Sequence, residues 1–233
     1  IQRVYRGERN QKGRYREFYQ ADIDVIGKDI LPLAYDAEVP AIIHGIFTEL
    51  AIGKFTIRIN NRKLLKGLLE SVGIPDDKQT AVLHEVDRLG KQPRAEIEAR
   101  VAEGVGADVA KRLFDALLAN AGDSAAVLES LTGLASPTAT FVEGLRELRE
   151  VYEGTLALGV PAAQCVIDLS IVRGLDYYTG SVYETFLDEY PKLGSICSGG
   201  RYGNPAGHYT KRKLPGVGIS IGVTRLFSNL CEI

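Results

Sequence analysis

Among its 233 residues the sequence has no methionine, no tryptophan and only three cysteines. Because the chain begins at Ile1 and lacks methionine, we interpret it as part of a longer protein with elements missing at one or both ends. The cysteines are odd in number and widely spaced, which argues against a zinc site and favours a reduced, cytoplasmic protein. Cys165 and Cys197 lie in apolar stretches and are expected to be small buried hydrophobic residues.

Long apolar runs and a strong charge imbalance are also absent. No hydrophobic stretch approaches the length of a membrane span, and no secretory leader is visible. The formal net charge of -2 gives no overall sign of nucleic-acid binding, although a local basic surface can serve a protein that is acidic overall. No phosphate loop, dinucleotide fingerprint or serine-type nucleophile is found, and none of the three histidines is assigned a catalytic role.

A β-hairpin is predicted at the start of the chain. Residues 2–6 and 15–27 are strand-like, and the polar segment 7–14 connects them. Alternation in the second strand places one set of side chains on a largely apolar face and a second, mixed aromatic and polar set on the other. The second set comprises Arg16, Phe18, Gln20, Asp22 and Asp24. Such a face fits either a solvated sheet surface or the lining of a pocket.

The remaining patterns predict helices and further strands. A helix begins near Asp36, interpreted as its N-cap; a strand covers 55–59, and a helix over 64–72 ends at Gly73 and Pro75. Residues 75–135 are rich in Ala, Leu, Glu and Arg and predict short helices. Further elements are a helix over 137–159, strands over 164–172, 180–187 and 193–198, and a run over 216–227 that passes from strand into helix.

These elements predict an α+β fold: a mainly antiparallel sheet flanked by helices, with a helical insertion domain. The chain then divides into a first part of the core at 1–62, the insertion at 63–136 and a second part of the core at 137–233.

Three clusters of residues carry the chemistry. The first is YRGER at 5–9 with GRYREFYQ at 13–20, the second is VRGLDYYTG at 172–180, and the third is GGRY at 199–202 with PGVGISIG at 215–222 and TRL at 224–226. Together they resemble the histidyl-tRNA synthetase family: motif 2 of class II synthetases in its histidine-specific form, a signature particular to this family, and a second family signature merging into class II motif 3. The resemblance covers almost the whole chain apart from the helical segment.

The resemblance implies the class II catalytic core and an enzyme that activates histidine with ATP, with Mg²⁺ on the ATP phosphates, and then loads histidine onto tRNA as a homodimer. Arg6 is expected to hold the α-phosphate, and Arg225 the γ-phosphate. Glu8 would accept a hydrogen bond from the adenine amino group, and Phe18 would stack on the adenine ring. Guanidinium groups suit these roles because they stay charged and form paired hydrogen bonds with phosphate oxygens.

The same resemblance implies the amino-acid site. Arg173 would contact both the histidine carboxylate and the α-phosphate, a place where related synthetases use a metal ion, so no metal ligand is assigned. Gln20 and Asp24 would bind the amino and carboxylate ends of histidine, and Tyr178 and Tyr202 would shape the imidazole pocket. The alternative for Arg173 is an ion pair with Asp176 or another surface acid.

Glycines at 199, 200, 216, 218 and 222 would allow close backbone approach beneath a flat adenine or a small amino acid, or simply tight packing. Tyr177 and Tyr178 cannot both face a pocket from one strand, and their alternative role is packing in the core.

Some features depart from the family pattern. Gly203 follows GGRY where members often carry aspartate, and Thr224 stands where many carry an acid. Class II motif 1, with the histidine-binding threonine and glutamate that precede motif 2, and the C-terminal anticodon-binding domain are not in the sequence.

Two other classes of protein remain as alternatives: a synthetase-like regulatory subunit of the first enzyme of histidine biosynthesis, and a synthetase-like tRNA-binding sensor domain. The helical segment suggests contact with the tRNA acceptor arm, but its basic residues are interspersed with acids, so a solvated helical surface is equally open. These basic residues include Lys78, Arg88, Lys91, Arg94, Arg100, Lys111 and Arg112.

Overall fold

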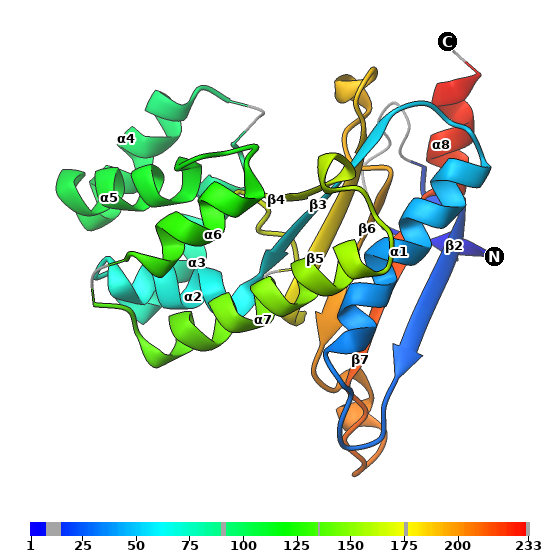
Figure 1. Cartoon of the computed structure of the whole chain (residues 1–233), viewed down its shortest axis with the longest axis horizontal. Coiled ribbons are helices and arrows are strands. Elements are labelled where there is room, and N and C mark those ends of the chain that lie inside the picture. Colours follow the sequence, from blue (N-terminus) through cyan, green and yellow to red (C-terminus); the bar gives the residue numbers. More distant parts are fainter. Residues whose placement is uncertain (8–14, 90–91, 135, 175–176, 232–233) are drawn as a thin grey trace.

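The computed structural model describes residues 1–7, 15–89, 92–134, 136–174 and 177–231, and its centre is a seven-stranded sheet (Figure 1). The strand order is β1-β2-β7-β6-β5-β3-β4. All neighbouring strands run antiparallel except β3 and β4, which are parallel. The predicted α+β class with a mainly antiparallel sheet is therefore confirmed.

Most strands lie where alternation predicted them. The strands are β1 (Gln2–Tyr5), β2 (Glu17–Ile26), β3 (Phe55–Asn61), β4 (Cys165–Ile167), β5 (Tyr178–Leu187), β6 (Cys197–Tyr202) and β7 (Gly216–Ile221). β1 and β2 form the expected antiparallel hairpin, whose connecting residues 8–14 lie outside the described residues.

Two strand predictions were wrong in extent. The strand expected over 164–172 covers only β4, because the Asn60 amide donates to the carbonyls of Leu169 (3.1 Å) and Ile171 (2.9 Å) and so satisfies this backbone without a ladder. The strand expected over 193–198 begins instead at Cys197, since Pro191–Leu193 form a short 3₁₀ helix and Gly194 turns the chain at φ 66°.

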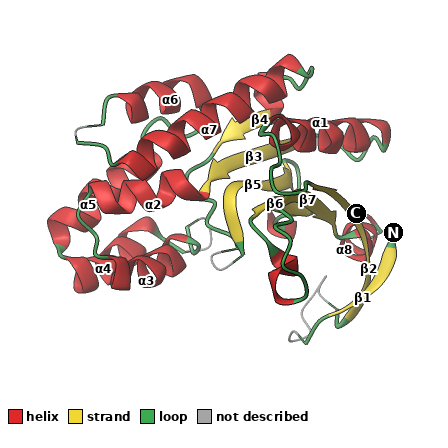
Figure 2. Cartoon of the chain, turned by 90° about the horizontal axis from the view of Figure 1, so that it is seen from below, coloured by secondary structure: helices red, strands yellow, loops and turns green. Residues whose placement is uncertain are grey.

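Helices α1 (Ala34–Glu49) and α7 (Ala139–Ala157) cover the apolar face of the sheet (Figure 2). This face carries the buried side chains of Ile57, Ile59, Val217 and Ile219. Cys165 and Cys197 are also buried, as expected. Among the described residues, no helix has the length and apolar character needed to cross a membrane.

Asp36 does not cap α1. The helix begins at Ala34, and Asp36 lies in its first turn with no exposed surface. The Arg201 guanidinium of β6 donates from Nε to both Asp36 carboxylate oxygens at 3.0 Å. Burial raises the pKa of Asp36, and the hydrogen bonds from Arg201 oppose that rise. This ion pair, rather than a cap, ties α1 to the sheet, and removal of one partner of such a pair typically costs about 3–5 kcal/mol.

Helices occupy the stretch between β3 and β4. Besides α7, they are α2 (Arg62–Ser71), α3 (Asp76–Val86), α4 (Arg94–Val105), α5 (Ala107–Leu118) and α6 (Ser124–Thr132). The Asn61 side chain caps α2 by accepting from the Lys63 N–H at 2.8 Å. Gly73 follows the helix at φ 88°, in agreement with the predicted end of this helix. In Figure 1, α4 and α5 lie at the end of the molecule opposite α8 (Val223–Leu230).

Candidate active site

The second face of the sheet is polar where the family-like clusters meet. Strand pairing places Asp22 opposite Ser220, and Ser220 opposite Ser198. One step along the same face, Asp24 lies opposite Gly218, and Gly218 opposite Gly200. The mixed face predicted for β2 is therefore continuous with polar and glycine positions of β7 and β6.

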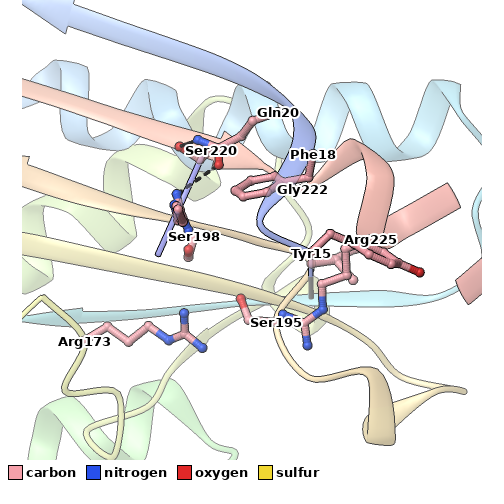
Figure 3. A pocket seen from close by; sticks show the side chains of 11 residues that line it. Tyr15, Phe18, Gln20, Arg173, Ser195, Ser198, Ser220, Gly222 and Arg225 are labelled. Carbon is pink, nitrogen blue, oxygen red and sulfur yellow. Dashed lines mark hydrogen bonds between the residues drawn. The ribbon is translucent and has the colours of Figure 1, made fainter. Parts of the chain in front are cut away.

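A cavity of about 150 Å³ lies at one end of this face (Figure 3). Arg6, Phe18 and Gln20 reach it from the hairpin. The cavity is also lined by two further arginines: Arg173, in the loop after β4, and Arg225 of α8. The remaining lining residues are Tyr15, Ser195, Ile196, Ser198, Ser220 and Gly222. The described lining includes three arginines and no carboxylate, which makes the cavity suited to an anion.

Contacts between side chains brace the hairpin wall of this cavity. The Arg6 guanidinium donates to the side-chain amide oxygen of Gln20 at 2.9 Å and lies 5.1 Å from the Phe18 ring centroid. Gln20 is buried, and its amide donates to the Ser220 hydroxyl at 2.8 Å and to Asp22 at 2.7 Å. A hydrogen-bond donor, a flat ring and an amide are thus held side by side.

The loop that carries Arg173 is held from β3. Besides the two hydrogen bonds from Asn60, the Arg58 guanidinium donates to Asp168 at 2.8 Å. Asp168 in turn accepts from the backbone N–H of Ser170 at 2.9 Å. Arg173 itself forms an ion pair through Nε with the buried carboxylate of Glu184. The acid suggested as its alternative partner, Asp176, lies outside the described residues.

Arg225 is placed by the junction between β7 and α8. It lies in the first turn of α8, and its guanidinium donates to the Leu193 carbonyl. The neighbouring Thr224 hydroxyl accepts from the backbone N–H of Tyr19 at 2.7 Å. β2 and β7 pair as far as Ala21 and Ile221, so the threonine oxygen supplies an acceptor to β2 where β7 has ended.

Three of the residues expected to bind histidine form a separate cluster. The Tyr202 hydroxyl donates to Asp24 at 2.8 Å. The Tyr177 ring lies 5.2 Å from that of Tyr178 and 5.4 Å from that of Tyr202. Burial and the hydrogen bond to Asp24 raise the pKa of Tyr202. The cavity of about 150 Å³, called the arginine cavity below, is lined by Gln20 and Arg173. Its lining does not include Asp24, Tyr178 or Tyr202.

Several features were missed by, or differ from, sequence reasoning. Tyr177 joins the tyrosine cluster because it lies before β5, in a turn where its N–H bonds to the Gly174 carbonyl at 3.0 Å, and not in a strand. At two of the glycines the nearest groups belong to the chain itself: a Cβ on Gly216 would meet the Tyr202 ring, and one on Gly218 would lie 2.1 Å from Asp24. Glu8 lies outside the described residues.

A larger cavity of about 650 Å³ adjoins the first and shares Arg173, Ser195 and Arg225 with it. Its other walls include the ion pair Arg58–Asp168 and residues of both charges, so it has no single electrostatic preference. The two shared arginines therefore lie at the junction of two cavities.

Comparison with solved structures identifies the class of protein. The whole chain matches 53% of the histidyl-tRNA synthetase from Nostoc, with a TM-score of 0.92 and 42% identity. It also matches a Bacillus halodurans protein described as an ATP phosphoribosyltransferase regulatory subunit/histidyl-tRNA synthetase, with a TM-score of 0.77. That likeness covers 98% of this chain and 56% of the other at 23% identity, which shows the fold alone. The fold is that of a class II aminoacyl-tRNA synthetase.

Sequence comparison identifies the family. The family model for histidyl-tRNA synthetase matches residues 1–226. The chain is 56% identical over 239 residues to the histidine–tRNA ligase of Xanthomonas axonopodis pathovar citri and 51% identical over 240 residues to that of Stenotrophomonas maltophilia. The chain belongs to the histidyl-tRNA synthetase family. It spans about half the length of these curated relatives, 50% and 52%.

Proposed function

We propose that this chain is the catalytic core of a histidine–tRNA ligase, which forms histidyl-adenylate from histidine and ATP and then transfers histidine to the 3′ end of its tRNA. The observation that carries the proposal is the meeting of Arg6, Arg173 and Arg225 around one cavity beside Phe18 and Gln20. These residues come from positions far apart in the sequence, and each belongs to a cluster with the family pattern.

In the proposed activation step, a carboxylate oxygen of histidine attacks the α-phosphorus of ATP, and pyrophosphate leaves. Negative charge develops on the phosphoryl oxygens, and cations fixed before the reaction stabilise it. Arg6 would hold the α-phosphate, and Arg225 the γ-phosphate. Arg173 would bridge the histidine carboxylate and the α-phosphate.

Adenine would stack on Phe18, which already lies beside the Arg6 guanidinium. The amino group of adenine would donate a hydrogen bond to Glu8. Mg²⁺ would enter with the ATP phosphates; since the described lining of the arginine cavity holds no carboxylate, we assign it no protein ligand.

Histidine recognition would join the cavity to the tyrosine cluster. Gln20 and Asp24 would bind the amino and carboxylate ends, and Tyr178 and Tyr202 would surround the imidazole. A site of this kind rejects apolar analogues because its own polar groups would be left without partners. The hydrogen bond from Tyr202 to Asp24 supports this by holding both groups in place before the substrate arrives.

The test is histidine-dependent ATP–pyrophosphate exchange by the full-length protein, followed by charging of its tRNA. Exchange with histidine and not with other amino acids is the expected result. A full-length protein that binds histidine without exchange would instead be a regulatory subunit or a sensor domain. The placement of Arg173 in the cavity favours the enzyme over those alternatives.

We further propose that the full-length protein is a cytoplasmic homodimer and that residues 63–136 form an insertion between the two parts of the core. Within this insertion, the helices in 75–135 would contact the tRNA acceptor arm. Acids already pair with several basic groups of these helices: Arg94 with Asp115 at 2.9 Å, and Arg100 with Glu85 at 2.7 Å. A solvated surface therefore remains the alternative. Unchanged tRNA affinity after deletion of 75–135 would reject the contact.

A further inference from the structure

Glu184 is a buried acid on the polar face of the sheet, near the middle of β5. Only 8% of the residue is exposed. Strand pairing places it between Arg58 of β3 and Ser198 of β6. A carboxylate in such a position needs a cationic partner, because transfer of an isolated charge out of water is strongly unfavourable.

The partner that the structure provides is Arg173, although Arg58 lies directly across from Glu184. The Arg58 guanidinium is engaged elsewhere: it pairs with Asp168 at 2.8 Å and lies 4.7 Å from the Phe186 ring centroid. The described ion pairs therefore join Arg58 to Asp168 and Arg173 to Glu184. Glu184 pairs with the arginine that reaches the anionic cavity.

The contact uses one side of the Arg173 guanidinium. The Glu184 carboxylate forms the ion pair on the Nε side, and the planar group also carries four N–H bonds on its two terminal nitrogens. Arg173 lines both cavities, whereas Glu184 lines only the larger one. In Figure 3 the Arg173 side chain extends toward Ser195, at the junction of the two cavities.

We propose that Glu184 is a positioning residue: it fixes the Nε side of Arg173, so that the terminal nitrogens are presented to the reacting phosphate and carboxylate. The assignment rests on the proposed function of Arg173 in adenylate formation. An arginine has several rotatable bonds, and misplacement of a catalytic group by about 1 Å can lower a rate by roughly 100-fold.

A double-mutant cycle in the full-length protein tests the proposal. We expect Glu184→Ala to lower kcat of histidine-dependent exchange by about 10- to 100-fold and to change KM for histidine much less. Glu184→Gln should lose less, because the amide keeps the size of the side chain and still places an oxygen beside Nε. Glu153→Ala, which removes an exposed acid from α7, is the matched control and should leave the exchange unchanged.

The decisive comparison is made with Arg173 removed. If Glu184 acts through Arg173, adding Glu184→Ala to Arg173→Ala should change kcat by less than about twofold. An equal loss in both backgrounds would overturn the proposal, as would an unaffected Glu184→Ala enzyme. Thermal unfolding separates a loss of fold from a loss of rate, and the isosteric Glu184→Gln variant remains informative if the alanine variant unfolds.

A measurement that does not depend on activity examines the ion pair itself. With ¹⁵N-labelled arginine, the Nε–H signal of Arg173, assigned by its loss in Arg173→Lys, should exchange slowly with solvent and become fast in Glu184→Ala. Fast exchange in the unsubstituted protein would overturn the inference even if the enzyme is active. Slow exchange in a protein without ATP–pyrophosphate exchange would contradict the proposed function and leave the positioning contact standing.

Discussion

Substitution of Gly144 in α7 by alanine tests how tightly the helices behind the site are packed. A Cβ at this position would lie 2.1 Å from the backbone nitrogen of Leu64 and 2.6 Å from its Cα, whereas real Cβ atoms essentially never approach closer than 3.0 Å. The obstructing atoms belong to the backbone of α2 and cannot rotate away. The two helices would therefore have to separate by about 1 Å, in an interior that is packed as densely as an organic crystal.

Two effects of opposite sign decide the outcome. Alanine in place of glycine inside a helix is favourable by about 1 kcal/mol. Overpacking typically costs about 1–3 kcal/mol, and a clash with backbone belongs at the upper end of that range. The net loss should be about 2 kcal/mol, which for a chain of this size lowers Tm by roughly 4–8 °C.

Gly45 in α1 provides the matched control. A Cβ there would meet nothing within 4 Å, so Gly45→Ala should keep the helix-propensity gain of about 0.5–1 kcal/mol and raise Tm. Both variants can be compared by thermal unfolding followed by circular dichroism. A Gly144→Ala protein as stable as Gly45→Ala would refute the close approach of α2 and α7.

Three further predictions concern the site and the thiols. In the full-length protein, Arg173→Ala should lower kcat of adenylate formation by about 10²- to 10³-fold while weakening histidine binding far less. The control is Arg146→Ala, which removes an exposed arginine. If Arg173→Ala kept an exchange rate equal to that of this control, Arg173 would have no part in the mechanism. Thr224→Val deletes the acceptor for the Tyr19 N–H, a hydrogen bond worth about 0.5–1.5 kcal/mol, and should raise KM for ATP. Thr224→Ser keeps the hydroxyl and should leave this KM unchanged. Identical behaviour of the two variants would contradict the role of this hydrogen bond between α8 and β2. Burial raises the pKa of the Cys165 thiol to about 12 and also raises the pKa of Cys197, so both thiols stay protonated at pH 8. A thiol reagent should therefore label only the exposed Cys231 until the protein unfolds. Rapid labelling of all three cysteines in the folded protein would contradict this burial.

Local patterns in the sequence determined much of this protein. Period-2 alternation placed Phe18, Gln20 and Asp24 on one face of β2, and the structure places that face against the polar positions of β7. Hydrophobic periodicity located α1, α2 and α7, because an amphipathic helix needs only its own residues to show which side is apolar. The family clusters pointed to Arg6, Arg173 and Arg225, which the fold brings to one cavity.

Only the tertiary structure decided which charged groups meet. Asp36 looked like a helix cap, but the sheet order brings Arg201, 165 residues away, onto its carboxylate. Glu184 was one acid within a predicted strand, and its pairing with Arg173 depends on the loop that Asn60 holds in place. The separation of the tyrosine cluster from the arginine cavity likewise depends on strand register. Periodicity reports which face a side chain occupies, whereas the choice of partner depends on contacts between segments that are distant in the chain, and the sequence alone does not contain those distances.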